Sequence, residues 1–365
     1  MLTLNKTLYG LNDVTIVPAV MSDIDSRKEC DTCHKDGFLP LFTAPMSSVI
    51  DESNWNTFMD AGIRSVVPRS VPFDIRMGLS YSTFVAVGLD ELKSIIDSDG
   101  NPEYKRKKRY FCVDIANGHM KKLYGMCAKA KEIYGDCISL MTGNIANPET
   151  YFHIADNYTG VIDYIRCGIG GGSACTTSAN GGLHYPMASL LSEIRYTRNI
   201  GNISGIYPKI VADGGFSNFD QIIKALALGA DYVMLGNIFA RCDEACGKTH
   251  IDYNIEKYPN SLVYEDTYKN GYGELDAAIR YVKFREYYGM STKKAQREFG
   301  GNGNKTSEGI VKYVPVEYTL AGWVDNFKSY LKSVMSYTGF RKIEDFICGP
   351  RLAVMTNSAY TTYFK

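Results

Sequence analysis

The segment KIVADGGFSNFDQIIKALALGADYVMLG, residues 209–236, contains two short strand patterns on either side of one helix pattern. Residues 209–213 and 232–236 are rich in apolar side chains and end in Asp or Gly, whereas residues 219–228 carry apolar side chains at helical spacing. Strands that are apolar on both faces are typical of a parallel sheet covered by helices. The segment therefore predicts a strand–helix–strand unit with a right-handed crossover.

The same alternation extends through most of the chain. Helix patterns stand between several of the strand patterns, at 52–61, 90–97, 120–134, 148–157 and 187–197. Eight strand–helix units close into a (β/α)8 TIM barrel of the α/β class, although an open doubly wound sheet is the competing interpretation. The six further strand patterns are residues 39–44, 63–67, 84–88, 110–114, 137–143 and 161–168.

Two regions fall outside the repeat of strands and helices. We expect one catalytic domain over residues 1–365, in which the polar, turn-rich residues 1–38 cover the bottom of the barrel. The stretch 241–318 is longer than a final helix requires, and it contains the glycine-rich GGNGN at 300–304. This stretch predicts a mobile active-site flap at about residues 290–314.

Composition limits the classes of function. The 365 residues are 45% hydrophobic and 22% charged, and no apolar run reaches the length that spans a bilayer. The start of the chain shows no export or import signal, so we expect a cytoplasmic protein with no membrane partner. A formal net charge of zero argues against nucleic acid as the main partner. Ten dispersed cysteines are too dilute for a disulfide scaffold.

The chemistry of a barrel enzyme lies in the loops that follow its strands. The sixth strand pattern opens into GIGGGSACTT, where four glycines in five residues precede Ser173, Ala174 and Cys175. Glycines let backbone groups approach a ligand or an ion, and N–H dipoles favour the thiolate form of a cysteine. The loop therefore predicts Cys175 as a covalent nucleophile.

The loops after the seventh and eighth strand patterns are typical of a phosphate site. Asp213, Gly214 and Gly215 follow one strand, and Gly236 and Asn237 follow the next. Such loops supply backbone donors to a phosphate and a carboxylate to ribose hydroxyls. They occur in several classes of enzyme and predict a phosphorylated ligand without naming a reaction.

One cysteine motif competes with this interpretation. Cys30, Cys33 and His34 have the spacing of a haem attachment site, and Cys242 with Cys246 could complete a four-thiolate zinc site. Haem attachment usually requires export, and the second pair lies far away in the sequence. An incidental polar loop is the favoured interpretation.

Several segments together resemble the IMP dehydrogenase and GMP reductase family. They are GIGGGSACTT, residues 210–236, EYYGMS and KTSEGIVKYVP, and the start of the chain is similar to GMP reductases, especially the bacterial type. The resemblance covers nearly the whole chain. It implies a TIM barrel that binds GMP or IMP, uses NADPH, possesses a potassium site and assembles as a homotetramer in purine salvage.

The resemblance also implies a role for particular residues. Cys175 would bond to C2 of the purine, and Thr177 with Glu308 would relay protons. Asp114, Asn144 and Glu244 would face the nicotinamide nucleotide, and backbone carbonyls of Gly170, Gly172 and Cys175 would bind K⁺. The substrate would contact Ser173, Asp213, Gly214, Gly215, Gly236, Asn237, Tyr287, Gly289, Met290 and Ser307.

Within the family, the sequence favours GMP reductase. Strands two and three are separated by too few residues for the regulatory CBS modules of IMP dehydrogenases, and no Arg-Tyr pair follows Met290. The alternatives are a minimal IMP dehydrogenase and a weakly catalytic purine-nucleotide-binding regulatory barrel. The ligand-facing loops depart from the family pattern at Ser47, Arg69 and Asn237. A modified or deoxy guanine nucleotide is therefore an alternative substrate.

Overall fold

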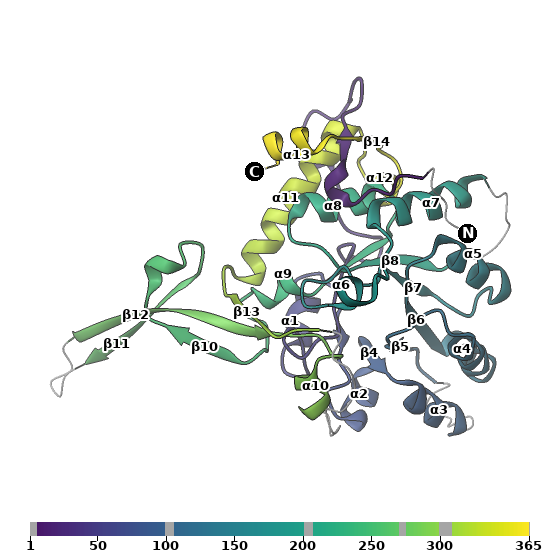
Figure 1. The fold of residues 1–365 in the computed structure, drawn as a ribbon, viewed down its shortest axis with the longest axis horizontal. Helices are drawn as coiled ribbons and strands as arrows, with labels where there is room; N and C mark the ends of the chain where they lie inside the picture. Colours follow the sequence, from purple (N-terminus) through teal and green to yellow (C-terminus); the bar gives the residue numbers. More distant parts are fainter. Residues whose placement is uncertain (1–5, 99–105, 201–206, 270–274, 299–308, 365) are drawn as a thin grey trace.

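Eight parallel strands form the centre of the molecule in the computed structural model, which describes residues 6–98, 106–200, 207–269, 275–298 and 309–364. Their order is β2-β9-β8-β7-β6-β5-β4-β3, and a parallel bridge between Phe42 and Arg64 joins the two ends. The predicted (β/α)8 barrel is therefore confirmed (Figure 1). Its strands are β2 (Leu41–Thr43), β3 (Val66–Val67), β4 (Phe84–Val87), β5 (Arg109–Val113), β6 (Ile138–Ile145), β7 (Tyr164–Cys167), β8 (Lys209–Asp213) and β9 (Tyr232–Leu235).

Aromatic rings fill the interior near the start of these strands. Phe42 contacts Phe84, Tyr164 and Tyr232, with ring centroids 5.0 to 5.8 Å apart. Large rings in edge-to-face contact pack a barrel interior as a solid core. The open end of the barrel, where the strands finish, is left for ligands.

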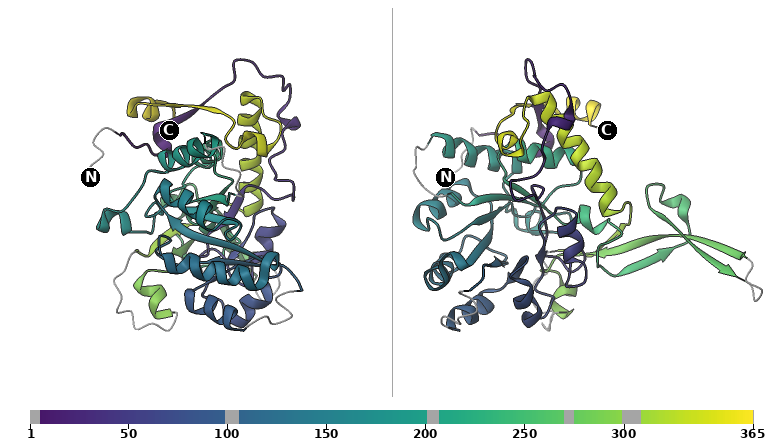
Figure 2. Two further views of the ribbon diagram at one scale, coloured as in Figure 1. Left: turned by 90° about the vertical axis from the view of Figure 1, so that its right-hand side faces the viewer. Right: turned by 180° about the vertical axis from the view of Figure 1, so that it is seen from behind.

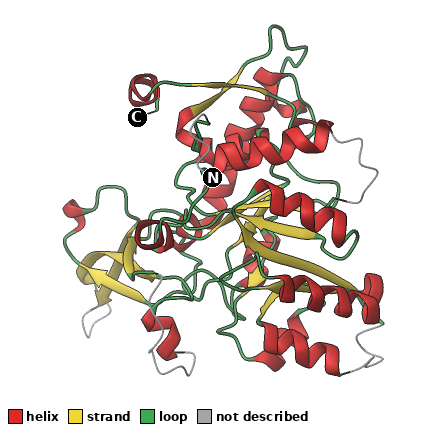
Figure 3. Cartoon of the chain, turned by 45° about the vertical axis from the view of Figure 1, so that its right-hand side comes forward, coloured by secondary structure: helices red, strands yellow, loops and turns green. Residues whose placement is uncertain are grey.

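Helices pack around the outside of the strands (Figure 3). All six predicted helices appear within a few residues of their expected bounds, and α8 begins with an Asn218 capping box. Among the helices around the barrel, the two that were not predicted are α2, which contains Gly78, and the long α11, whose Trp323 packs against Phe219 of α8. The helices around the barrel are α1 (Trp55–Asp60), α2 (Phe73–Leu79), α3 (Leu89–Asp97), α4 (Lys121–Tyr134), α5 (Pro148–Asn157), α7 (Met187–Ile200), α8 (Phe219–Ala227) and α11 (Leu320–Thr338).

An antiparallel sheet projects sideways from the barrel as an arm (Figures 1 and 2). It consists of β10 (Thr249–Asp252), β11 (Val263–Lys269), β12 (Leu275–Tyr287) and β13 (Lys312–Pro315), with β12 paired to the other three. Most of this arm precedes the predicted flap at about residues 290–314, and the sequence did not predict its antiparallel sheet. Residues 299–308, which include the predicted GGNGN, lie outside the described residues.

The two ends of the chain meet, because β1 (Val14–Val17) pairs with β14 (Arg351–Val354). The His34 ring hydrogen-bonds the Asp231 carbonyl at the start of β9, so residues near His34 lie at the bottom of the barrel. Lys6 and Leu8, in contrast, line the pocket at the opposite end. No helix among the described residues is long and apolar enough to cross a membrane. Short elements complete the chain: α6 (Thr177–Gly181), α9 (Asn237–Ala240), α10 (Lys293–Glu298), α12 (Ile343–Phe346), α13 (Asn357–Tyr363) and the 3-10 turns η1 (Leu11–Asp13), η2 (Arg27–Glu29), η3 (Gly135–Cys137) and η4 (Ile255–Lys257).

Candidate active site

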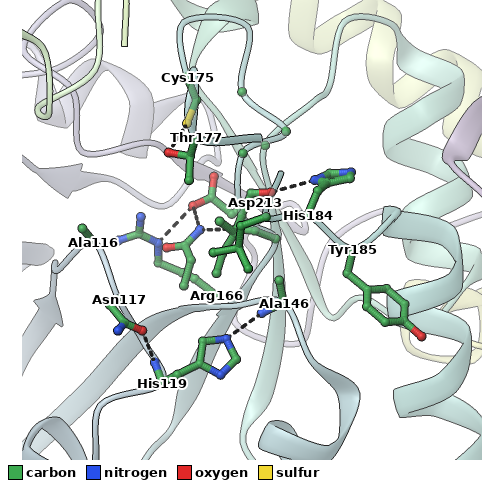
Figure 4. Close-up of a pocket in the computed structure, with 18 of the residues that line it drawn as sticks. Ala116, Asn117, His119, Ala146, Arg166, Cys175, Thr177, His184, Tyr185 and Asp213 are labelled. Atoms are coloured by element: carbon green, nitrogen blue, oxygen red, sulfur yellow. Dashed lines mark hydrogen bonds and ion pairs between the residues drawn. The ribbon is translucent and has the colours of Figure 1, made fainter. Parts of the chain in front are cut away.

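A large pocket opens at the carboxyl ends of the barrel strands (Figure 4). Its volume is about 1900 Å³, and Cys175, Thr177 and Asp213 line it together with Asp114 and Met290. Pockets for one small ligand usually measure about 300–1000 Å³. The cavity therefore has room for two nucleotide-sized ligands side by side.

The loop between β7 and α6 can follow its path only because it is rich in glycine. Gly168 and Gly170 have φ angles of +127° and +74°, a region that favours residues without a Cβ. A Cβ on Gly170 would overlap Ser178, whose hydroxyl donates to the Gly170 carbonyl over 2.8 Å. The loop folds tightly and presents Cys175 at the rim of the barrel.

Cys175 lines the pocket rather than the packed core of the barrel. Its thiol is partly exposed, and its Sγ lies 3.2 Å from Oγ1 of Thr177. Its backbone N–H donates to the Gly172 carbonyl over 2.9 Å. Burial, in contrast, raises the pKa of the thiols of Cys112 and Cys127 to about 12, which keeps them protonated. Among the described residues that line the pocket, Cys175 is the single cysteine.

Two residues near the end of the predicted flap pair with the Cys175 loop. Gly309 forms an antiparallel bridge with Cys175, and Ile310 N–H donates to the Ala174 carbonyl over 2.9 Å. A Cβ on Gly309 would lie only 2.7 Å from that carbonyl oxygen, so the two backbones approach closely. The predicted residues Ser307 and Glu308 lie just before this bridge, outside the described residues.

Sequence reasoning missed Arg166, which lies at the centre of the polar network. Arg166 Nη1 lies 2.7 Å from Asp114 Oδ1, and its Nε lies 3.1 Å from Asp213 Oδ2. Asn144 Nδ2 donates to the same Asp213 oxygen over 2.8 Å. Burial acts to lower the pKa of Arg166, but the two carboxylates outweigh it and raise that pKa well above its usual value. A charged residue inside an otherwise apolar strand was the available signal.

The predicted phosphate residues gather beside this network. A Cβ on Gly236 would lie 2.9 Å from the Tyr287 hydroxyl, and that hydroxyl contacts both Ser173 and the Asn237 backbone. Burial raises the pKa of the Tyr287 hydroxyl, which keeps it a hydrogen-bond donor. The loops after β7 and β8 also touch, since a Cβ on Gly214 would lie 3.1 Å from the Gly172 nitrogen and one on Gly215 would lie 3.1 Å from the Gly171 oxygen.

Two of the predicted residues have mainly structural contacts. Glu244 does not line the pocket, and its carboxylate accepts from Leu320 N–H over 2.8 Å at the start of α11. The Gly289 carbonyl accepts from the Thr292 hydroxyl over 2.8 Å and closes the turn that carries Met290. Helix-terminal N–H groups need such acceptors, which gives Glu244 a role in the fold.

The predicted potassium ligands are backbone carbonyls of one loop. Gly170 accepts from Ser178 and Gly172 from Cys175, and each carbonyl keeps a second lone pair. Oxygen donors of this kind suit K⁺. The described part of the chain contains no group of three His, Cys, Asp or Glu side chains that could hold a metal ion.

Comparisons with known proteins identify sequence relatives of this chain. The model of the IMP dehydrogenase / GMP reductase domain matches residues 105–362. A GMP reductase of Buchnera aphidicola is 26% identical over 359 residues, covering 92% of this chain and 91% of its own length. A GMP reductase of Chromobacterium violaceum is 31% identical over 256 residues, with 66% and 75% covered. An IMP dehydrogenase of Chlorobaculum parvum is 29% identical over 258 residues, but only 45% of its length is covered.

The matched range 105–362 includes the loops that carry Asp114, Cys175 and Asp213. The chain belongs to the IMP dehydrogenase / GMP reductase family.

Proposed function

We propose that this protein is a GMP reductase. The overall reaction is GMP + NADPH + 2 H⁺ → IMP + NADP⁺ + NH₄⁺. The observation that carries the proposal is the accessible thiol of Cys175, 3.2 Å from Thr177, in a cavity large enough for both a mononucleotide and a dinucleotide. The relatives from Buchnera aphidicola and Chromobacterium violaceum bear the name GMP reductase, which supports the same function.

Cys175 performs the covalent step. Its thiolate attacks C2 of the purine, the C2–N bond breaks, and the amino group leaves as ammonia after protonation. Thr177 and Glu308 deliver that proton, because an amino group leaves readily only when protonated. Forming a covalent intermediate divides one difficult exchange into two accessible steps.

Substrate binding uses the loops after β7, β8 and β9. Ser173, Gly236 and Tyr287 supply donors for the 5′-phosphate, and Gly214, Gly215 and Asn237 complete this cradle. Asp213, held by Arg166 and Asn144, accepts from the ribose hydroxyls. Gly289, Met290 and Ser307 contact the base, so the purine lies with C2 toward Cys175.

Residues of the same pocket fit the cofactor. Reduced nicotinamide, when bound, supplies the hydride that displaces sulfur at C2. Asn144 lies in β6, next to β7, and Asp114 directly follows β5, one strand further along the sheet. They present a donor and an acceptor, which suits a carboxamide and a ribose. K⁺ bound by the Gly170, Gly172 and Cys175 carbonyls would hold the loop in shape. The oligomeric state that we propose for the protein is a homotetramer.

Two parallel assays test this function. The purified protein is incubated with GMP and NADPH, and separately with IMP and NAD⁺, while absorbance of the reduced cofactor is followed. We expect NADPH oxidation with release of IMP and ammonia in the first assay only. Formation of XMP from IMP would identify a dehydrogenase, and nucleotide binding without either reaction would identify a regulatory barrel.

A further inference from the structure

The pocket extends well beyond Cys175, to an end built by the start of the chain and by α7. Lys6 and Leu8 line this end together with Tyr185, Glu193 and Tyr196. Figure 4 shows Tyr185 well apart from Cys175. The residues proposed above to bind the substrate and nicotinamide include none of these, although all of them line the same cavity.

Backbone contacts hold the start of the chain against α7. Tyr9 N–H donates to the Ser189 hydroxyl over 2.8 Å, and Ser189 N–H donates to the Tyr9 carbonyl over 3.0 Å. Ser189 is buried, and Glu193 lies one helical turn further along α7. This reciprocal pair fixes the path of the chain three residues after Lys6 and brings the Lys6 side chain to the pocket.

The polar groups at this end offer donors rather than acceptors. Lys6 Nζ lies 2.5 Å from Glu193 Oε2, and the Tyr185 hydroxyl donates to Glu193 Oε1. Both oxygens of the carboxylate are therefore engaged. The ammonium group carries three N–H donors and its side chain is 51% exposed, so donors remain for a ligand. Such a site suits an anion better than a ribose diol.

Two other strong bases line the pocket among the described residues, and neither competes with Lys6 for an anion at the α7 end. Arg166 is already enclosed by Asp114 and Asp213. Arg69 follows β3, and β3 and β7 are four places apart in the sheet, so Arg69 lies on another side of the pocket from α7. An anion at the α7 end would thus meet Lys6.

We propose that Lys6, oriented by Glu193 and Tyr185, binds the phosphate ester on the adenosine ribose of the cofactor and so selects NADPH over NADH. The inference rests on the proposed function, in which nicotinamide lies beside Asp114. The dinucleotide then has to extend along the cavity, and its adenosine half reaches the α7 end. NADPH differs from NADH only by this phosphate, so a single ammonium group can discriminate between them.

The test compares Lys6→Ala with Lys93→Ala. Lys93 is a matched control because it also forms an exposed ion pair, with Asp97, and does not line the pocket. KM is measured for NADPH and for NADH with GMP as substrate. In Lys6→Ala we expect KM for NADPH to rise about tenfold, the loss expected for one charge-assisted contact, while KM for NADH changes less than about twofold. Lys93→Ala should leave both values unchanged.

Two further measurements make the outcome decisive. Raising the salt concentration should increase the wild-type KM for NADPH more than that for NADH, and this difference should disappear in Lys6→Ala. Glu193→Gln should weaken NADPH binding less than Lys6→Ala, since the lysine remains. An equal effect of Lys6→Ala on both cofactors, or no effect, would overturn the assignment.

Failure of the proposed function would be recognised separately. If the wild type oxidises neither cofactor in the presence of GMP, the reductase assignment fails. The Lys6 assignment is then judged by titrating the fluorescence of NADPH and NADH with the wild type and with Lys6→Ala. A preference for NADPH that depends on Lys6 would support it, and equal affinities would refute it.

Discussion

Replacing Arg166 by Met should destabilise the protein strongly. The side chains of Arg166, Asp114 and Asp213 are only 10%, 17% and 16% exposed, so the three charges are largely buried although they line the pocket. Methionine keeps the apolar stem of the side chain but removes both ion pairs. Two carboxylates then remain close together without the cation that separates them.

The magnitude follows from the geometry of the network. Removing one partner of a buried ion pair typically costs about 3–5 kcal/mol, because the remaining charge is left uncompensated. Two carboxylates lose their partner here, so we expect about 4 kcal/mol or more at neutral pH. Arg166→Lys should cost less, since one ammonium can satisfy one carboxylate but cannot reproduce contacts made by both Nη1 and Nε.

Urea unfolding of four proteins measures this effect. They are the wild type, Arg166→Met, Asp114→Asn and the double variant, and the quantity compared is the free energy of unfolding. Because Asn removes one of the stranded charges, the double variant should lose less stability than the sum of the single variants. A loss below about 1 kcal/mol for Arg166→Met, or strict additivity, would refute the reasoning about the network.

Four shorter predictions concern chemistry and pH. Cys175→Ala should abolish turnover while GMP binding and thermal unfolding stay nearly unchanged, and residual activity above a few per cent in a spectrophotometric assay would remove the thiol from the mechanism. Guanosine should bind at least about a hundredfold more weakly than GMP by calorimetry, since several charge-assisted contacts are lost; equal affinities would contradict the phosphate cradle. Glu308→Gln should slow ammonia release from GMP far more than it weakens GMP binding, whereas hydride transfer from IMP to NADP⁺ should survive better; normal ammonia release would exclude Glu308 as proton donor. Burial acts to raise the pKa of Glu91, but Arg76 outweighs burial and the net pKa is lowered. The Glu91 carboxylate therefore stabilises the fold at neutral pH, and this stabilisation is lost as pH falls below about 4. The difference in unfolding free energy between wild type and Glu91→Gln should shrink in acid, and a difference that stays constant with pH would contradict this prediction.

The strands of the barrel could be predicted because each of them ends at a marked position. Asp213, Gly236 and Gly143 lie at or just beyond the predicted strand ends, and the strands themselves are apolar on both faces. The arm could not be predicted in this way. Its strands β11 and β12 mix charged with apolar and aromatic residues, and the search for short apolar runs passed over them although Asn270-Gly271 stands between them in the sequence. The strands β10 and β13, which also pair with β12, are separated from it by longer stretches of sequence, and no local pattern encodes such pairing.

Pairing between distant loops could not be predicted from the sequence either. Cys175 was predicted from its own loop, but its bridge to Gly309 depends on a close approach of two backbones that no local pattern encodes. The role of Lys6 depends in the same way on the reciprocal hydrogen bonds of Tyr9 and Ser189, which lie 180 residues apart. Local chemistry predicts which residues are reactive, whereas the fold decides which of them meet.

The polar network shows how far topology can extend such predictions. Asp114, Asn144, Arg166 and Asp213 come from β5, β6, β7 and β8 or from the residues directly after them, and these strands are neighbours in that order. Once a barrel is predicted, residues at the ends of adjacent strands must form a row, about 4.8 Å apart from strand to strand. A cation on one strand then lies within reach of carboxylates on both sides only if its side chain is long, which favours arginine at this position. The charge of Arg166 inside an apolar strand, together with the strand order, therefore contained the signal for a bridge between Asp114 and Asp213, although sequence reasoning did not use it.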